Sequence, residues 1–90
     1  MRRTRMTPTV RVRLFASARV AAGRSVLVWP VPSGGLTARR LVAELAERYP
    51  RLAPTLRASR FLRNDRYLTD LDEPLVPDDE FAVHPPYGGG

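Results

Sequence analysis

The stretch Phe81-Ala82-Val83-His84-Pro85-Pro86-Tyr87-Gly88-Gly89-Gly90 decides how the rest of the chain is interpreted. Apolar side chains alternate with Ala82 and His84, which predicts a strand with one buried face. Pro85 and Pro86 remove two backbone donors and fix φ, so the strand must end there. Glycine has no Cβ, so Gly88, Gly89 and Gly90 fit a channel too narrow for other residues. Residues 87–90 are therefore predicted to be an extended glycine tail that presents a carboxylate; the alternative is a frayed end or purification remnant.

Two more strands are predicted near the N-terminus. Val10 to Phe15 alternates apolar and basic side chains, and Ser25 to Trp29 forms an apolar run that ends at Pro30. Phe15 falls on the solvent side of the first strand, where it either covers the sheet edge or contacts a partner. Residues 16–24, which include Arg19, are expected to be a loop or a single helical turn closed by Gly23.

One substantial helix is predicted from an N-cap at Thr37 to about Tyr49, before Pro50. Its apolar side chains recur at helical spacing, and Glu44 and Arg48 have the i,i+4 spacing of an ion pair. Residues 51–59 are expected to form a short helix or an ordered loop.

A tight hairpin is predicted over residues 61–68 because Asn64-Asp65-Arg66 favours a turn. Acidic side chains then cluster without the spacing of a calcium loop, which indicates a solvated loop and no metal site. These residues are Asp70, Asp72, Glu73, Asp78 and Asp79.

Composition limits the classes of function. A chain of 90 residues with 43% hydrophobic content predicts one folded domain with a modest core. It has no cysteine and one histidine, so a disulfide framework and a thiol nucleophile are excluded and a protein-built zinc site is disfavoured. No stretch reads as a membrane span or signal peptide, which predicts a cytoplasmic protein that binds no membrane.

The net charge of +6 raises the possibility of nucleic-acid binding. Three of the arginines, Arg2, Arg3 and Arg5, belong to a leader before Met6, an alternative start. The other arginines are scattered, so the charge is attributed to solubility and nucleic acid is not an expected partner. Residues 1–8 are predicted to be a disordered basic arm.

The order of strands and helices predicts an α+β domain over residues 9–86. A central first strand beside a parallel last strand makes the β-grasp, or ubiquitin-like, arrangement the natural candidate. It is a small mixed sheet with one main helix on one face and a flexible C-terminal tail.

Several stretches together resemble the ubiquitin-like sulfur carriers, in particular the small subunit of molybdopterin synthase. They are Val12 to Arg19 with Ala22-Gly23, the helix from Leu41 to Pro50, Asn64-Asp65, and Leu75 to Gly90. The sequence departs from that family at Asp78, where Gly is usual, at Val20, where an acidic residue is common, and at Gly88, often a small residue with a side chain.

The resemblance implies that a ubiquitin-activating-type enzyme uses ATP to adenylate Gly90, which then carries sulfur covalently as a thiocarboxylate. Gly88 and Gly89 would let the tail thread into a partner, while Pro85, Pro86 and Tyr87 would orient it. Phe15, Arg19 and His84 are candidate docking residues. The implied acceptor complex contains the large subunit of molybdopterin synthase, which passes the sulfur to a pterin precursor. The chain itself is expected to bind no cofactor or metal and to have no active site of its own.

Three alternatives remain open from the sequence. The first is a carrier of the same fold that serves thiamine, cysteine or specialised-metabolite biosynthesis. The second is a ubiquitin-like protein modifier. The third is a basic nucleic-acid-binding module.

Overall fold

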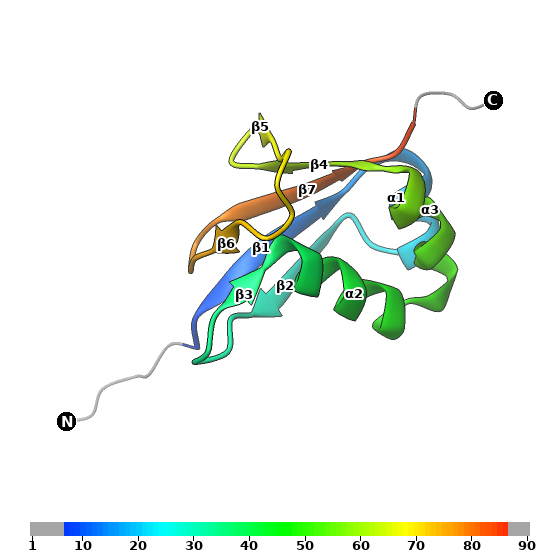
Figure 1. Cartoon of the computed structure of the whole chain (residues 1–90). Helices are drawn as coiled ribbons and strands as arrows, with labels where there is room; N and C mark the ends of the chain where they lie inside the picture. The colour runs from blue at the N-terminus through cyan, green and yellow to red at the C-terminus, as the bar shows by residue number, and fades with distance from the viewer. Residues whose placement is uncertain (1–6, 87–90) are drawn as a thin grey trace.

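A five-stranded mixed sheet forms the centre of the computed structural model, which describes residues 7–86. Along the sheet the order is β2 (Val26–Pro30), β1 (Thr9–Leu14), β7 (Glu80–His84), β4 (Arg60–Arg63) and β5 (Arg66–Tyr67). β1 and β7 run parallel, and the other neighbouring pairs run antiparallel. The last strand of the chain therefore lies between the two hairpins β1–β2 and β4–β5 (Figure 1). This arrangement confirms the predicted β-grasp fold.

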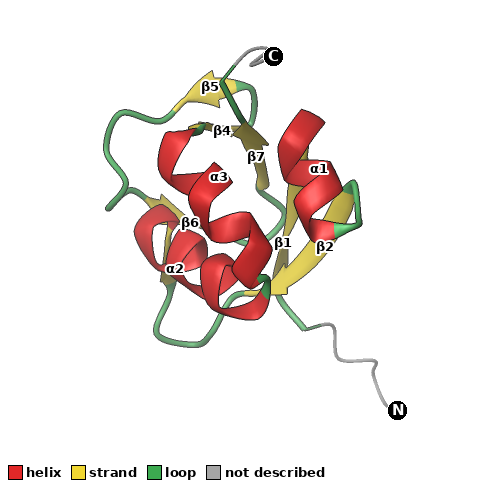
Figure 2. Cartoon of the chain, turned by 90° about the vertical axis from the view of Figure 1, so that its right-hand side faces the viewer, coloured by secondary structure: helices red, strands yellow, loops and turns green. Residues whose placement is uncertain are grey.

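The helices cover one face of this sheet (Figure 2). They are α1 (Ala16–Ala22), α2 (Ala38–Arg48), a 3₁₀ turn η1 (Pro50–Leu52) and α3 (Ala53–Ala58). A two-stranded sheet of β3 (Leu36–Thr37) and β6 (Pro74–Leu75) lies beside the start of α2. No helix of the described residues is long and apolar enough to cross a membrane.

Alternation along the strands creates the core. Inward-facing Val10, Val12 and Leu14 of β1 are fully or almost fully buried, as are Phe81 and Val83 of β7, whereas Arg11 and Arg13 are exposed. α2 supplies the opposite side through Ala38, Leu41 and Leu45. Burying these side chains removes apolar surface from water, which is the main favourable contribution to folding.

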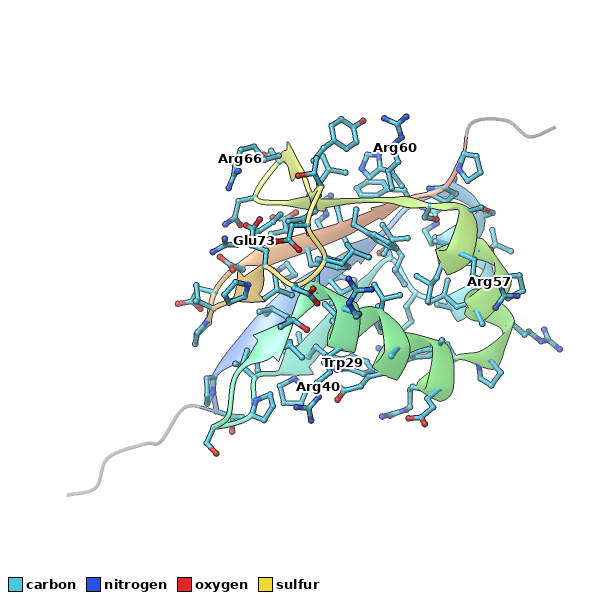
Figure 3. All side chains as sticks on the ribbon, viewed as in Figure 1. Trp29, Arg40, Arg57, Arg60, Arg66 and Glu73 are labelled. Carbon is cyan, nitrogen blue, oxygen red and sulfur yellow. The ribbon has the colours of Figure 1, made fainter. Side chains whose placement is uncertain are left out.

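The predicted N-cap of α2 is confirmed: the Thr37 hydroxyl accepts a hydrogen bond from the Arg40 N–H at 3.1 Å. The predicted ion pair of Glu44 with Arg48 is wrong. Its carboxylate pairs with Arg40 at 2.9 Å and accepts the Trp29 indole N–H at 2.8 Å, which holds its pKa below the usual value. Trp29 lies next to α2 (Figure 3). Glu44 thereby ties the main helix to the edge strand β2.

Residues 16–22 form two turns of helix, longer than the loop or single turn expected. Only Ala18 is buried, so the segment shows no apolar stripe that would reveal a helix from sequence. Gly23 ends the helix at φ 75°, and its N–H donates to the Arg19 carbonyl at 2.8 Å.

The hairpin prediction is confirmed, but Arg66, expected in the turn, belongs to β5. Asn64 and Asp65 both have positive φ, 49° and 70°, as a two-residue type I′ turn requires. The turn pairs Arg63 with Arg66 and Leu62 with Tyr67.

The prediction of a solvated acidic loop is wrong for Asp79. This residue is 5% exposed, and its carboxylate accepts hydrogen bonds from Arg63 Nε at 2.8 Å, Asn64 Nδ2 at 2.9 Å and the Val76 N–H at 2.8 Å. Burial acts to raise the pKa of Asp79, but these hydrogen bonds outweigh it and the pKa lies below the usual value. Asp78 before it adopts φ 74°, the left-handed conformation for which Gly is the usual residue.

Candidate functional site

The candidate site lies where β7 ends. Pro85 is half-buried, and Pro86 is exposed and is the last described residue. Tyr87, Gly88, Gly89 and Gly90 lie outside the described residues, so their predicted roles remain predictions. The parallel register places Val83 of β7 beside Leu14 of β1. The chain therefore leaves the domain next to the residue that follows β1.

That residue is Phe15, and its ring packs against the imidazole of His84 in a tilted arrangement. The ring centroids are 4.7 Å apart with an interplanar angle of 52°. Both side chains are half-buried, so part of each ring remains open to a partner. The Arg13 guanidinium lies 5.3 Å from the Phe15 ring centre, within the range of a cation–π contact. The structure thus brings together two of the three docking residues expected from the sequence.

The far side of β7 extends the same surface. Arg60 of β4 stands opposite His84 in the sheet, and its guanidinium lies 5.6 Å from the ring centre of Tyr67. Arg60 projects on the side of β4 away from α2 (Figure 3). Tyr67 is 57% exposed although it is a large aromatic residue. We refer to Arg13, Phe15, Arg60, Tyr67 and His84 together as the docking surface.

Small and apolar side chains continue this surface across the helix-free face. Ala82 lies between Arg13 and Leu62 in the register, and Leu62 pairs with Tyr67. Arg13 is also paired with Glu80 at 3.1 Å. An aromatic and apolar centre with arginines at its rim is the usual composition of a protein-binding surface.

Arg19, the third expected docking residue, lies one helical turn beyond Phe15. Its backbone N–H donates to the Phe15 carbonyl at 3.4 Å, and its side chain is exposed. It makes no ion pair with another residue of the described range. Its position beside the docking surface is compatible with a role in docking, and nothing in its contacts requires one.

Sequence reasoning missed Arg13, Arg60 and Tyr67. Each occupies an outward position of a strand, but such positions join one surface only when the strand order is known. Within residues 7–86, no group of three His, Asp or Glu side chains is arranged to hold a metal ion. The site offers binding groups and an exit for the chain.

Comparison with known proteins finds one matching sequence family and several solved structures with a similar fold. A model of the ThiS family matches residues 12–90. A putative molybdopterin converting factor subunit 1 from Pyrococcus furiosus has 26% identity and a TM-score of 0.79, over 89% of this chain and 99% of that one. The small archaeal modifier protein 1 from Haloferax volcanii has 26% identity and a TM-score of 0.78, over 91% of this chain and 99% of that one.

A third structure, a complex of subunits 1 and 2 of the molybdopterin-converting factor from Helicobacter pylori, has 23% identity and a TM-score of 0.66. It covers 91% of this chain and 99% of the matched chain, and at this identity it supports the fold alone. No curated protein sequence matches the chain.

Proposed function

The chain belongs to the ThiS family of ubiquitin-like sulfur carriers, and from this premise we propose that Gly90 carries sulfur as a thiocarboxylate for the sulfuration of a pterin precursor. The observation that carries the proposal is the position of the β7 exit beside the docking surface. A partner that binds Phe15 and His84 is held next to Pro85-Pro86, from which the glycine tail leaves. The family match extends through Gly90, the residue assigned to the chemistry.

The proposed chemistry requires an activating partner because a carboxylate has no good leaving group. The Gly90 carboxylate attacks the α-phosphate of ATP, which forms an acyl adenylate and releases pyrophosphate. The terminal sulfur of a persulfide then attacks the acyl carbon and expels AMP. A thiol cleaves the resulting S–S bond, which leaves the thiocarboxylate on the carrier. All of these reactions take place on partner enzymes, and the carrier contributes its tail and its docking surface.

The pterin acceptor is proposed from the neighbours of this chain. One similar structure, at 26% identity, is a putative molybdopterin converting factor subunit 1, a name that implies a second subunit. We propose a corresponding large subunit as the acceptor partner. The tail would enter its active site, and two successive carriers would supply the two sulfurs of a dithiolene.

The first test is the intact mass of the protein after incubation with an adenylating enzyme, ATP and a sulfur donor. A gain that matches one oxygen replaced by sulfur is expected, and a Gly90 deletion should abolish it. A Pro8→Ala variant, altered far from the tail, serves as the matched control. Absence of the gain under conditions that load a control carrier would contradict the proposal. Loss of the added mass upon mixing with a large subunit and pterin precursor would then identify the acceptor.

Protein modification is the second candidate, because small archaeal modifier protein 1 is as similar to this chain as the converting factor subunit. In that case the Gly90 carbonyl would be found in amide linkage to lysines of other proteins. Mass spectrometry of conjugates from the native host separates the two functions. Thiamine or cysteine sulfuration would instead show as sulfur transfer without a pterin acceptor.

A further inference from the structure

The two edges of the main sheet differ sharply. At one edge, β5 has only two residues, one of which is Arg66. At the other edge, β2 has five residues, Val26–Pro30, with no charged side chain among them. Short or charged edge strands resist pairing with other chains, whereas long apolar edges favour it. β2 is therefore the edge at which another strand can add.

The hydrogen-bond register shows which groups of β2 are available. Leu14 N–H donates to the Ser25 carbonyl and Val31 N–H donates to the Pro8 carbonyl, so odd-numbered residues of this segment face β1. The N–H and C=O groups of Val26 and Val28 consequently point away from the sheet. None of them has a backbone partner elsewhere in the described part of the chain. The Val28 side chain is also 66% exposed.

A groove runs beside this edge, between β2 and the end of α2. It has a volume of about 490 Å³, and Trp29 and Tyr49 provide aromatic walls. Strand side chains alternate in direction, so an added strand would direct every second side chain toward this groove. The remaining side chains would lie next to Val26 and Val28 on the open face.

The charges of the groove identify the kind of strand that fits. Arg24 and Arg48 line it, and neither forms an ion pair with any residue from 7 to 86. The acidic group of the lining, Glu44, is already neutralised by Arg40 and bound by Trp29. The groove therefore has excess positive charge. A second copy of this basic chain fits poorly, while a strand with acidic residues is complementary in charge.

We propose that the free edge of β2 binds an extended acidic peptide segment of a partner protein by β-strand addition. Main-chain hydrogen bonds to Val26 and Val28 provide affinity, one apolar side chain enters the groove, and acidic side chains reach Arg24 and Arg48. Val26 is paired with Arg13 of the docking surface, so the two binding regions adjoin, but none of the residues assigned to the peptide belongs to the docking surface. The inference is independent of the sulfur-carrier function.

The test uses a capped synthetic peptide of alternating valine and threonine followed by three glutamates. A second peptide with lysines in place of the glutamates is the charge control. We expect the acidic peptide to shift the amide NMR signals of Val26 and Val28 and to slow their hydrogen exchange. The lysine peptide should bind at least about tenfold more weakly, because like charges face each other.

Two protein variants separate the backbone and charge contributions. Val28→Pro removes an outward N–H that the sheet does not use, and we expect affinity to fall about fivefold or more. Arg24→Glu with Arg48→Glu should abolish the preference for the acidic peptide. Arg57→Glu with Arg66→Glu makes the same change in net charge away from β2 and should leave binding within about twofold.

Three outcomes would overturn the proposal. The first is an acidic peptide that leaves the Val26 and Val28 amides unchanged at millimolar concentration. The second is equal binding of the acidic and basic peptides. The third is concentration-dependent protection of these amides in the protein alone, which would assign the edge to a second copy. The charge variants keep the test decisive if Val28→Pro does not fold.

Discussion

Phe15 and His84 belong to opposite ends of the domain sequence, yet their rings are in contact with centroids 4.7 Å apart. The contact follows from the parallel pairing of β1 with β7, which places Leu14 beside Val83 and the next residues within reach of each other. A partner that binds this pair therefore contacts the start of the domain and the exit of its tail at once.

Truncation of the Phe15 ring should weaken partner binding more than folding. Phe15→Ala removes an aromatic anchor that lies outside the buried core, so we expect affinity for the activating enzyme to fall about tenfold or more. Calorimetric titration measures this change, and circular dichroism checks the fold. Val76→Ala, an exposed residue in the β6–β7 connection, is the control and should bind normally. Unchanged affinity of Phe15→Ala would remove this residue from the docking surface.

Charge reversal should show whether an arginine of the docking surface contributes more to partner association than an arginine elsewhere on the protein. Arg60→Glu places a carboxylate beside Tyr67 and opposite His84, so we expect slower association with an acidic partner surface and less thiocarboxylate formed. Arg57→Glu makes the same charge change on α3 and should have a small effect. Equal losses in both variants would show that overall charge, and not the docking surface, governs association.

Asp79 should control stability and its dependence on pH. Asp79→Asn breaks a buried, hydrogen-bonded pair with Arg63, and we expect the free energy of unfolding to fall by about 3 kcal/mol at neutral pH. Chemical denaturation measures the change. Glu47→Gln, which alters charge by the same amount at an exposed position of α2, should be within about 0.5 kcal/mol of the parent.

The direction of the pH effect follows from the lowered pKa of Asp79. The ionised carboxylate stabilises the fold at every pH above the ordinary Asp pKa of about 3.9, and this contribution disappears as pH falls through the lower pKa of the folded state. The difference in the free energy of unfolding between the parent and Asp79→Asn should thus be constant near neutral pH and become smaller below about pH 4. A difference that stays constant to lower pH would contradict the assignment.

The indole of Trp29 should contribute through its hydrogen bond as well as its packing. Trp29→Phe removes the donor to Glu44, and we expect a loss of about 1–2 kcal/mol, measured by urea unfolding followed by circular dichroism. Arg40→Ala removes the exposed ion pair of the same carboxylate. Apart from the change in helix propensity, we expect it to lower the free energy of unfolding by about 0.5 kcal/mol or less. If both variants lost equal stability, the indole hydrogen bond would not be the stronger link between β2 and α2.

The β4–β5 turn offers a stabilising substitution. Asp65 has φ 70° at a position where Gly is preferred, so Asp65→Gly should raise the free energy of unfolding by about 0.5–1 kcal/mol. Asp65→Val, with a branched side chain in the same conformation, should lower it. Denaturation midpoints of the two variants on opposite sides of the parent would confirm that the turn conformation is responsible.

The segments with a regular apolar pattern are predictable from the sequence, because a single feature, either alternation or a capped apolar stripe, determines the secondary structure of each. Alternation identified β1 and β7, and an N-cap at Thr37 with an apolar stripe identified α2. The length of α1 is not predictable, because its small side chains bury little surface and form no apolar stripe. β3 and β6, with two residues each, are too short to show a period.

The docking surface was harder to predict because it depends on register. Phe15 and Arg60 become neighbours of His84 only through strand order and parallel pairing, which no local pattern contains, and Tyr67 joins them through its contact with Arg60. The burial of Asp79 is hidden from the sequence for a related reason. A carboxylate after a turn is usually solvated, and its partners Arg63 and Asn64 lie in another hairpin.

The central position of β7 also has a consequence during translation. The hairpins β1–β2 and β4–β5 share no ladder of the main sheet until β7, the last strand synthesised, inserts between them. Such non-local pairing closes late and slowly. A nascent chain that still lacks residues 80–84 has no Phe15–His84 contact. The docking surface can therefore form only after β7 has joined the sheet.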